Sequence, residues 1–250
     1  MKDAKIKYYL EIADNALILS HRLSENSSNG PFLEEDLACT NVALDLIGMA
    51  ESLYNGAAEL SDEDVTGDDL AYRRDEWDYY NSLLVEQPNG DFAHLMVRQF
   101  FTDAFNYYFL TELSHSNDEY LSAVGAKSLK EVTYHVRRST EWMIRFGNGT
   151  DESFQRATAA INDLWRYTDE LFIPTEADLK VRESGISVNL EKVKEEWNGK
   201  INEVFYLSTL KKPENQFQLN GGKEGRHSEY MGYILTEMQY LTNRYPEAAW

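Results

Sequence analysis

The sequence predicts an all-α protein, built as a helical bundle with a helical C-terminal extension. Apolar residues recur at helical spacing over four or five segments of about 22–28 residues each. Glycine and proline are scarce, with 14 and 5 copies in 250 residues, which argues against the many tight turns of a sandwich or barrel. Hydrophobic residues make up 42% of the chain, enough for a sizeable core. Because neither a repeat nor a long linker stands out, we expect a single domain over residues 1–250.

The first five helices are expected at residues 3–25, 33–60, 69–86, 91–115 and 118–146. The periodic spacing of apolar residues defines them, and the polar stretches "ENSSNGP" and "SDEDVTGDD" separate the first three. Asp91 follows the turn sequence "QPNG" and is a plausible N-cap of the fourth helix. Gly147 is expected to end the fifth helix as its C′ residue.

Of the remaining helices, one is expected at residues 151–172, and three shorter ones are expected at 175–183, 189–206 and 228–244. Pro174 ends the regular pattern of the first of them. The glycine-rich loop "NQFQLNGGKEGRH" (residues 215–227) brings Lys223 and Arg226 near backbone amides that could meet a phosphate. We interpret it as a plain flexible loop, because nothing else nearby is typical of a phosphate site.

The composition excludes several classes of function. A net charge of −19 repels phosphate backbones and anionic bilayers, so we expect neither nucleic acid nor membrane as a partner. Cys39 is the sole cysteine, which excludes disulfides and cysteine-based zinc sites within the chain. The N-terminal stretch lacks the apolar segment of a signal peptide, and no window reaches membrane-spanning length. We therefore expect a cytoplasmic protein.

The segment "KEVTYHVRRS" raises the question of a metal site, because Glu131 and His135 stand one helical turn apart. A di-iron helix bundle takes one Glu from each of two helices and a Glu-x-x-His pair from each of two more. Here Val132 stands three residues before His135, so the di-iron spacing is absent. We expect Glu131 and His135 to form a buried hydrogen-bonded pair. The alternatives are a mononuclear or interface metal site, such as zinc with a third converging ligand, or two surface positions.

Other positions are typical of a degraded form of the same di-iron ligand set. Asp103 and Asn106 occupy the middle of the aromatic-rich helix, where a Glu-x-x-His pair would stand. Asp45 is the candidate acid of the preceding long helix. We predict that this chain binds no metal, has no catalytic residue and keeps the following remnant of a metal site: Asp45, Asp103, Asn106, Glu131 and His135.

Three further strings match the Glu-x-x-His spacing by letter, or nearly so. Glu112 and His115 lie at a helix end, Glu224 and His227 in the glycine-rich loop, and Asp91 and His94 at a cap. An alternative function remains, that of a self-sufficient metal-dependent oxidoreductase. Its ligands would be drawn from two helices: Glu112, His115, Glu131 and His135.

Five sequence blocks occur in an order and spacing that point to one family. The blocks are "ALDLIGMAESLY", "NSLLVEQPNGDFAHLMVRQFF", "KEVTYHVRRSTEWMIRFGNGTDES", "INDLWRYTDELF" and "GRHSEYMGYILTEMQYL". With them the chain closely resembles the non-catalytic, ferritin-like C subunits of bacterial phenylacetyl-CoA 1,2-epoxidases. The resemblance covers essentially the whole chain, and it is weakest at residues 61–69 and 207–217.

The resemblance implies a role in aerobic phenylacetate catabolism. The family's complex epoxidises the aromatic ring of phenylacetyl-CoA with O2 and with electrons that NADPH supplies through a reductase holding FAD and an iron–sulfur centre. The di-iron site belongs to the homologous catalytic A subunit. The C subunit keeps the bundle without the iron ligands, holds no cofactor and stabilises the A subunit within a hetero-oligomer. A helical scaffold unrelated to oxygenation is the remaining alternative.

The resemblance also implies that two short stretches contact the acyl-CoA at or near the interface with the A subunit. The first follows "RDE" and consists of Asp78, Tyr79, Tyr80 and Asn81. The second follows "ELF" and consists of Leu179, Lys180 and Val181. Polar and aromatic groups of the first stretch could meet an adenine or pantetheine arm, and Lys180 could meet a phosphate.

Overall fold

A computed structural model describes residues 1–214, 216–246 and 248, so it omits the start of the glycine-rich loop at 215 and residues 247, 249 and 250. Every regular element of the described residues is a helix, which confirms the predicted all-α, ferritin-like fold class. None of these helices is both long and apolar enough to cross a bilayer.

The chain forms two compact units, and each draws on separate stretches of sequence. Unit 1 comprises Met1–Glu86, Thr175–Val181 and Gly221–Trp250. Unit 2 comprises Gln87–Pro174 and Arg182–Asn220. The single domain over residues 1–250 stays a prediction.

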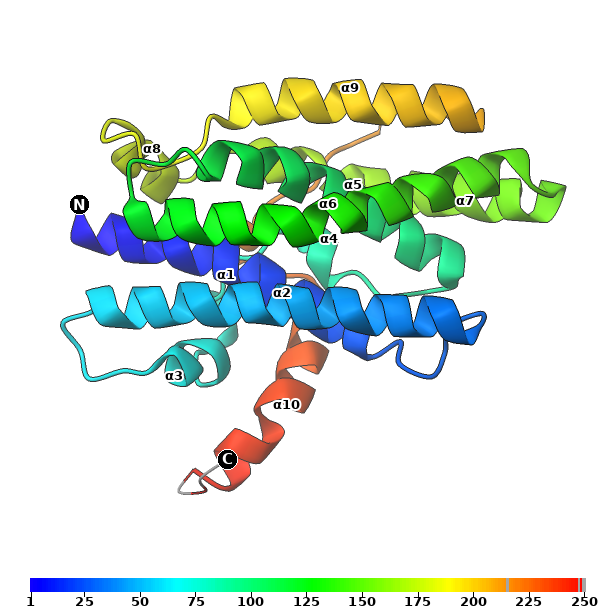
Figure 1. Ribbon diagram of the computed structural model, residues 1–250. Coiled ribbons are helices and arrows are strands. Elements are labelled where there is room, and N and C mark those ends of the chain that lie inside the picture. Colours follow the sequence, from blue (N-terminus) through cyan, green and yellow to red (C-terminus); the bar gives the residue numbers. More distant parts are fainter. Residues whose placement is uncertain (215, 247, 249–250) are drawn as a thin grey trace. The chain divides into compact units, whose positions relative to one another are not determined.

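Two long helices, α1 (Lys2–Ser24) and α2 (Leu33–Leu60), form the core of unit 1. They run side by side in opposite directions (Figure 1). Small residues such as Ala13, Ala50 and Ala57 are fully buried along them, which lets the two backbones approach closely. The hydroxyl of Ser20 donates a hydrogen bond to the backbone oxygen of Ala43 at 2.8 Å, so the pair is joined by polar contacts as well.

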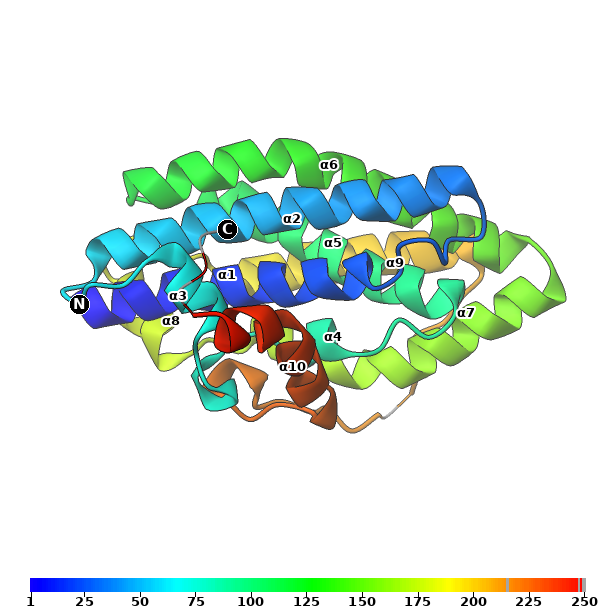
Figure 2. The same cartoon turned by 90° about the horizontal axis from the view of Figure 1, so that it is seen from below.

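Short helices complete unit 1 around this pair. They are α3 (Gly67–Tyr72), η1 (Glu76–Asp78), α4 (Leu83–Glu86), α8 (Glu176–Arg182, with residues 176–181 in this unit), η4 (Gly222–Glu224) and α10 (Glu229–Arg244). Within the unit, α3 packs against α2 and α10 packs against α1, and Figure 2 shows α3 and α10 close to each other. The predicted continuous helix at 69–86 is wrong, because side chains of α1 bind the backbone amides of residues 80 and 82 and hold that stretch out of helical geometry.

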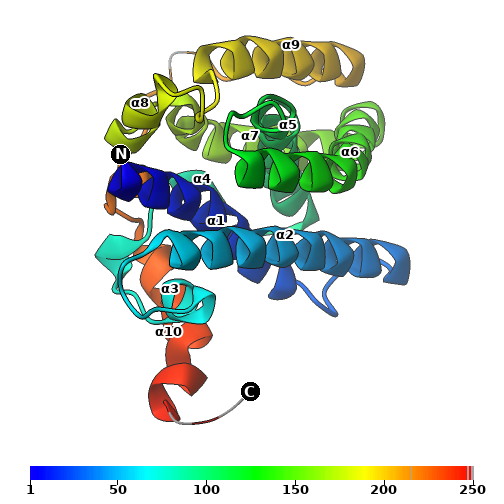
Figure 3. The same ribbon diagram turned by 60° about the vertical axis from the view of Figure 1, so that its left-hand side comes forward.

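Unit 2 is built around α5 (Phe92–Leu113), which packs against α6 (Glu119–Asn148), α7 (Asp151–Leu164) and α9 (Leu190–Ser208) (Figure 3). The Asp91 side chain accepts a hydrogen bond from the backbone N–H of His94 at 2.9 Å, so its prediction as an N-cap is confirmed. Aromatic rings fill the core, and the buried Trp197 indole donates a hydrogen bond to the backbone oxygen of Phe101 at 3.0 Å.

Two predicted helix ends in unit 2 are wrong. The helix predicted at 151–172 ends at Leu164 and continues as the 3₁₀ segments η2 (Trp165–Tyr167) and η3 (Asp169–Phe172). Gly147 lies inside α6, which runs on to Asn148. A Cβ atom at Gly147 would stand 1.8 Å from the backbone oxygen of Ser208, so the close approach of the end of α9, and not a helix stop, requires glycine there.

Candidate functional site

The first predicted ligand stretch is anchored by the buried carboxylate of Asp14 on α1, which is 0% exposed. Asp14 accepts hydrogen bonds from the Tyr54 hydroxyl at 2.5 Å, from the backbone N–H of Tyr80 at 2.8 Å and from the guanidinium of Arg74. Arg74 in turn donates to the backbone oxygen of Asp78 at 2.6 Å. These bonds satisfy backbone groups that a helix would have paired, so they fix the irregular course of residues 74–80.

Tyr79 and Asn81 point into unit 1, and neither side chain is exposed. The Tyr79 hydroxyl donates to the backbone oxygen of Ala71 at 2.7 Å, and burial raises its pKa above the ordinary range. The Asn81 amide donates to Oε1 of Glu86 at 2.9 Å. In this structure, both residues therefore support the stretch from inside and present no side-chain surface to a ligand.

Glu86 and His227 form a buried pair directly behind this stretch, and no spacing in the sequence predicted it. Nδ1 of His227 stands 2.6 Å from Oε1 of Glu86, and Nε2 donates to the backbone oxygen of Tyr79 at 3.0 Å. Burial lowers the pKa of His227, but the hydrogen bond to Glu86 and the negative charge of Glu86 outweigh it, so the pKa is raised. Ser228 completes the cluster by donating to Oε2 of Glu86 through its backbone N–H at 2.8 Å.

Lys7 on α1 lies beside the first stretch and close enough to α8, which carries the second, to interact with it electrostatically. The Lys7 ammonium lies 4.3 Å from the centroid of the half-buried Tyr80 ring. Its charge also contributes to lowering the pKa of Glu176, which is lowered first by its hydrogen bond with Lys180 at 2.6 Å. Lys7 is therefore adjacent to Tyr80 and near the helix that carries the second stretch, and no sequence signal distinguished it from the other lysines.

The remaining members of the predicted ligand set differ in exposure. Asp78 is exposed, Leu179 is 51% exposed and the Lys180 side chain is 57% exposed. Val181 is fully buried. The surface that these stretches offer thus consists of one carboxylate, one aromatic ring, one apolar side chain and two ammonium groups: Asp78, Tyr80, Leu179, Lys7 and Lys180.

A second buried cluster fixes the stretch that begins at Thr175. Oδ2 of Asp178 accepts from the Thr175 backbone N–H at 2.8 Å, and Nζ of Lys223 lies 3.6 Å from the same oxygen. Glu11, 3% exposed, belongs to this cluster. Burial, followed by the charge of Asp178, raises the pKa of Glu11 to about 8. Lys223 is therefore directed at buried carboxylates, and Arg226 pairs with Glu224 at 2.5 Å.

The metal-site remnant predicted in unit 2 is brought together in part. Asp103 on α5 and His135 on α6 are each 1% exposed, and both belong to one interior cluster. The Gln99 amide donates to Oδ1 of Asp103 at 2.6 Å. Burial raises the pKa of Asp103, while the neighbouring side chains of His135, Ser139, Gln99 and Arg138 oppose this rise.

The other members of the predicted remnant are less buried. Asn106 and Glu131 are half-buried on α5 and α6, and Asp45 is half-buried on α2 in unit 1. The hydrogen bond between Glu131 and His135 stays a prediction. In the described part of the chain, no group of three or more His, Cys, Asp or Glu side chains converges so that it could hold a metal ion.

The four ligands of the alternative metal site, Glu112, His115, Glu131 and His135, do not come together in the structure. Glu112 forms an ion pair with Lys192 at 2.6 Å. His115 is exposed just beyond α5, with Nδ1 2.9 Å from the backbone oxygen of Thr111, whereas His135 is buried inside unit 2. The two histidines therefore do not share a coordination sphere.

Comparison with known proteins decides the family. The sequence profile of the family described as phenylacetic acid catabolic protein matches residues 1–250. The chain belongs to this family. Within it, the chain is 44% identical over 243 residues to the C subunit of the 1,2-phenylacetyl-CoA epoxidase of Escherichia coli (strain K12), and the match covers 97% of this chain and 98% of that protein. The resemblance drawn from the five sequence blocks is thereby confirmed.

Proposed function

We propose that this chain is the non-catalytic structural subunit of a phenylacetyl-CoA 1,2-epoxidase. In that role it binds the di-iron catalytic A subunit, holds the helices of that partner in place and lines one side of the acyl-CoA site. Its relationship to the E. coli protein over nearly the full length of both chains supports the assignment to this complex. The structural role is supported separately, by the chemistry of the buried cluster in unit 2.

That cluster is the observation that carries the structural role. A di-iron site needs several carboxylates to balance the charge of two cations, with imidazoles completing the coordination. Around Asp103 the chain instead supplies an amide from Gln99 and the positive charge of Arg138. Neither group compensates a metal cation, so the residues present do not fit a di-iron centre. We therefore place no reaction step in this chain.

The cofactors of the reaction belong to the partners in this proposal. The iron pair is held by the A subunit, and FAD, the iron–sulfur centre and NADPH belong to the reductase. This chain contributes helix faces that exclude water from its partner and keep the partner's helices in register. An interface of this kind is expected to be large and apolar.

The acyl-CoA contact is proposed for the surface around Lys7. Coenzyme A carries phosphate groups, and ammonium groups bind phosphate as point charges. Lys7 and Lys180 supply two such groups, and the ring of Tyr80 beside Lys7 offers a face on which an adenine could stack. Tyr79, Asn81 and Val181 would act in this site from beneath the surface.

Metal content tests the proposal most directly. Iron and zinc are measured by elemental analysis on the full chain alone and on its complex with the A subunit. A metal-free chain and about two irons per complex are expected. The variant His135→Ala should weaken assembly or stability while the assembled complex keeps its iron. A stoichiometric metal in the chain alone would instead support a self-sufficient enzyme and refute the structural role.

A further inference from the structure

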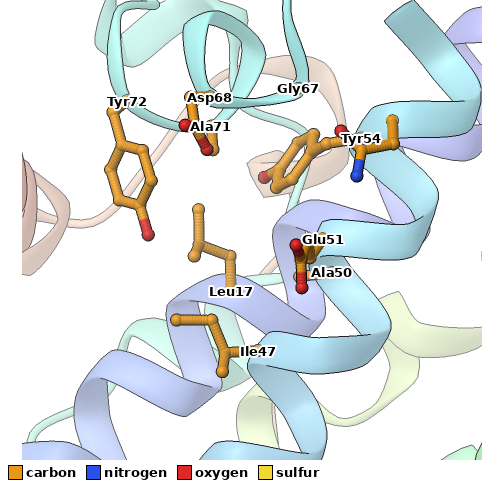
Figure 4. Close-up of a pocket in the computed structure, with 10 residues that line it drawn as sticks. Leu17, Ile47, Ala50, Glu51, Tyr54, Gly67, Asp68, Ala71 and Tyr72 are labelled. Carbon is orange, nitrogen blue, oxygen red and sulfur yellow. The ribbon is translucent and has the colours of Figure 1, made fainter. Parts of the chain in front are cut away.

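Unit 1 contains a pocket that none of the stretches above uses. It lies between α1, α2 and α3 and has a volume of about 230 Å³. Leu17 and Ile47 line its apolar side, while Tyr54 and Tyr72 stand on opposite sides of the space (Figure 4). The volume suits a small organic molecule or one long side chain.

The polar groups of the pocket are acidic. Glu51 and Asp68 both line it and both are exposed, and neither forms an ion pair with another described residue. The hydroxyl of Tyr72 lies close enough to sense them, because the pKa of Tyr72 is raised first by burial and then by the charges of Asp68 and Glu51. The pocket mouth therefore carries an uncompensated negative potential.

The nearby basic groups do not cancel this potential. Arg74 lies 5.6 Å from the centroid of the Tyr54 ring, but its guanidinium is paired with the buried Asp14. The His21 and Tyr72 rings pack edge-on with centroids 6.4 Å apart, and burial lowers the pKa of His21, which disfavours its charged form. No basic residue lines the pocket itself.

We propose that this pocket binds a monovalent organic cation that has a short apolar stem, such as an alkylammonium or arylalkylammonium group. The stem contacts Leu17 and Ile47, the two tyrosine rings flank it, and the charged head meets Glu51 and Asp68. Aromatic faces attract cations through their quadrupole. A carboxylate or phosphate would meet two like charges, so anionic ligands are excluded. The proposal is independent of the proposed function.

A titration followed by methyl NMR tests this site on the full chain. The probes are phenethylamine, the neutral 2-phenylethanol and the anionic 3-phenylpropanoate, and the readout is the methyl resonance of Ile47, assigned through Ile47→Val. We expect the amine to shift this resonance saturably and the other two probes to have little effect. Raising the salt concentration should weaken the amine, because exposed charges are screened.

Matched variants test separately how far amine binding depends on the negative charges and how far it depends on the shape of the pocket. The double variant Glu51→Gln, Asp68→Asn should weaken amine binding at least about five-fold. Its control, Glu59→Gln with Asp64→Asn, removes the same charge from exposed positions outside the pocket and should leave the affinity nearly unchanged. Tyr72→Phe keeps the ring and should keep binding, whereas Tyr72→Ala should lose most of it.

Any one of three results would overturn the proposal. If the alcohol shifts Ile47 as strongly as the amine, if no probe binds, or if the pocket double variant binds like its control, the site has no preference for cations. The source of the cation follows from repeating the titration on the complex with the A subunit. A shift lost on assembly identifies a basic side chain of the partner as occupant, and a retained shift identifies a free amine.

Discussion

Two buried carboxylates, Asp14 in unit 1 and Asp103 in unit 2, have almost the same exposure and very different surroundings. Asp14 is 0% exposed and accepts bonds from a guanidinium, a phenol and a backbone amide. Asp103 is 1% exposed, and although the Gln99 amide binds Oδ1, Oδ2 accepts no hydrogen bond from the described residues.

The difference follows from the local backbone. Asp14 faces an irregular stretch, where the amide of Tyr80 is free to donate because no helix uses it. Asp103 lies within α5 and faces α6, and inside regular helices the backbone amides are already bonded to carbonyls four residues earlier. A carboxylate there depends on side chains for its partners. Burial then disfavours the charged form, and the pKa of Asp103 rises.

The largest effect is expected from Asp14→Ala. This change leaves the Arg74 guanidinium, 11% exposed, without its carboxylate, and an uncompensated buried charge costs about 3–5 kcal/mol. Urea unfolding measures the loss. The control is Asp78→Ala, which removes an exposed carboxylate from the same stretch and should change the free energy of unfolding by less than about 0.5 kcal/mol. Equal effects of the two changes would contradict the anchoring role of Asp14.

The second-largest effect is the pH dependence of stability that we expect from Glu11, whose pKa is raised to about 8. A carboxyl with a raised pKa in the folded state stabilises the fold at acidic pH, and this stability is lost as pH rises through about 8. Between pH 6 and pH 9 the chain should lose about 2–3 kcal/mol through this group.

The variant Glu11→Gln isolates that contribution, since it keeps a polar group and removes the titration. Its free energy of unfolding should be flatter than that of the unaltered chain between pH 6 and pH 9. Glu59→Gln, at an exposed position of α2, serves as the control and should leave the slope unchanged. Identical slopes in Glu11→Gln and the unaltered chain would refute the raised pKa.

A smaller effect is expected from Asp103→Asn, and its sign sharpens the contrast with Asp14. Because the pKa of Asp103 is raised, the carboxyl stabilises the fold below its ordinary pKa and loses that contribution as pH rises. The Asn variant should therefore be about as stable as the unaltered chain below the ordinary pKa of the carboxyl, at about pH 3.5, and more stable at pH 8.5, by up to about 1 kcal/mol. Destabilisation at both pH values would mean that unit 2 needs the carboxylate.

The smallest effect is expected at the proposed acyl-CoA surface. Lys7→Ala should weaken the binding of coenzyme A to the complex about five-fold, and Lys180→Ala somewhat less, because exposed ammonium groups contribute up to about 1 kcal/mol each. Isothermal titration at low salt measures both. Lys200→Ala, which removes an ammonium paired with Glu203 in unit 2, is the matched control. An unchanged affinity in Lys7→Ala would remove Lys7 from the site.

Much of the fold could be predicted from the sequence, because long helices bury one face at regular spacing. The helices expected at 33–60 and 91–115 are observed as Leu33–Leu60 and Phe92–Leu113. The helix expected at 69–86 is not continuous in the structure, and the cause cannot be found in the local sequence. Its apolar spacing continues through Leu84, but the backbone there is bound by Asp14 and Asn15, which lie far away in the sequence.

The candidate site likewise contains some residues that the sequence could predict and others that it could not. Asp103 and His135 could be assigned to one group of five positions in advance, because each has a fixed place on a long helix, although the partner expected for His135 is Glu131. Lys7 and the Glu86–His227 pair could not, since they depend on contacts between segments distant in the sequence, and His227 follows Glu86 by 141 positions. Local spacing predicts which face of a helix a residue occupies, but it does not predict which loop will return to that face.

The division of the chain into two units has a consequence for its synthesis. Every residue of unit 2 lies between positions 87 and 220, whereas unit 1 needs residues from 1–86 together with residues from 221 onwards. On the ribosome, α1 and α2 emerge first, yet the His227 and Ser228 that bind Glu86 emerge among the last. All residues of unit 2 are therefore synthesised before position 221 is reached, while unit 1 can close only after almost the whole chain has been made.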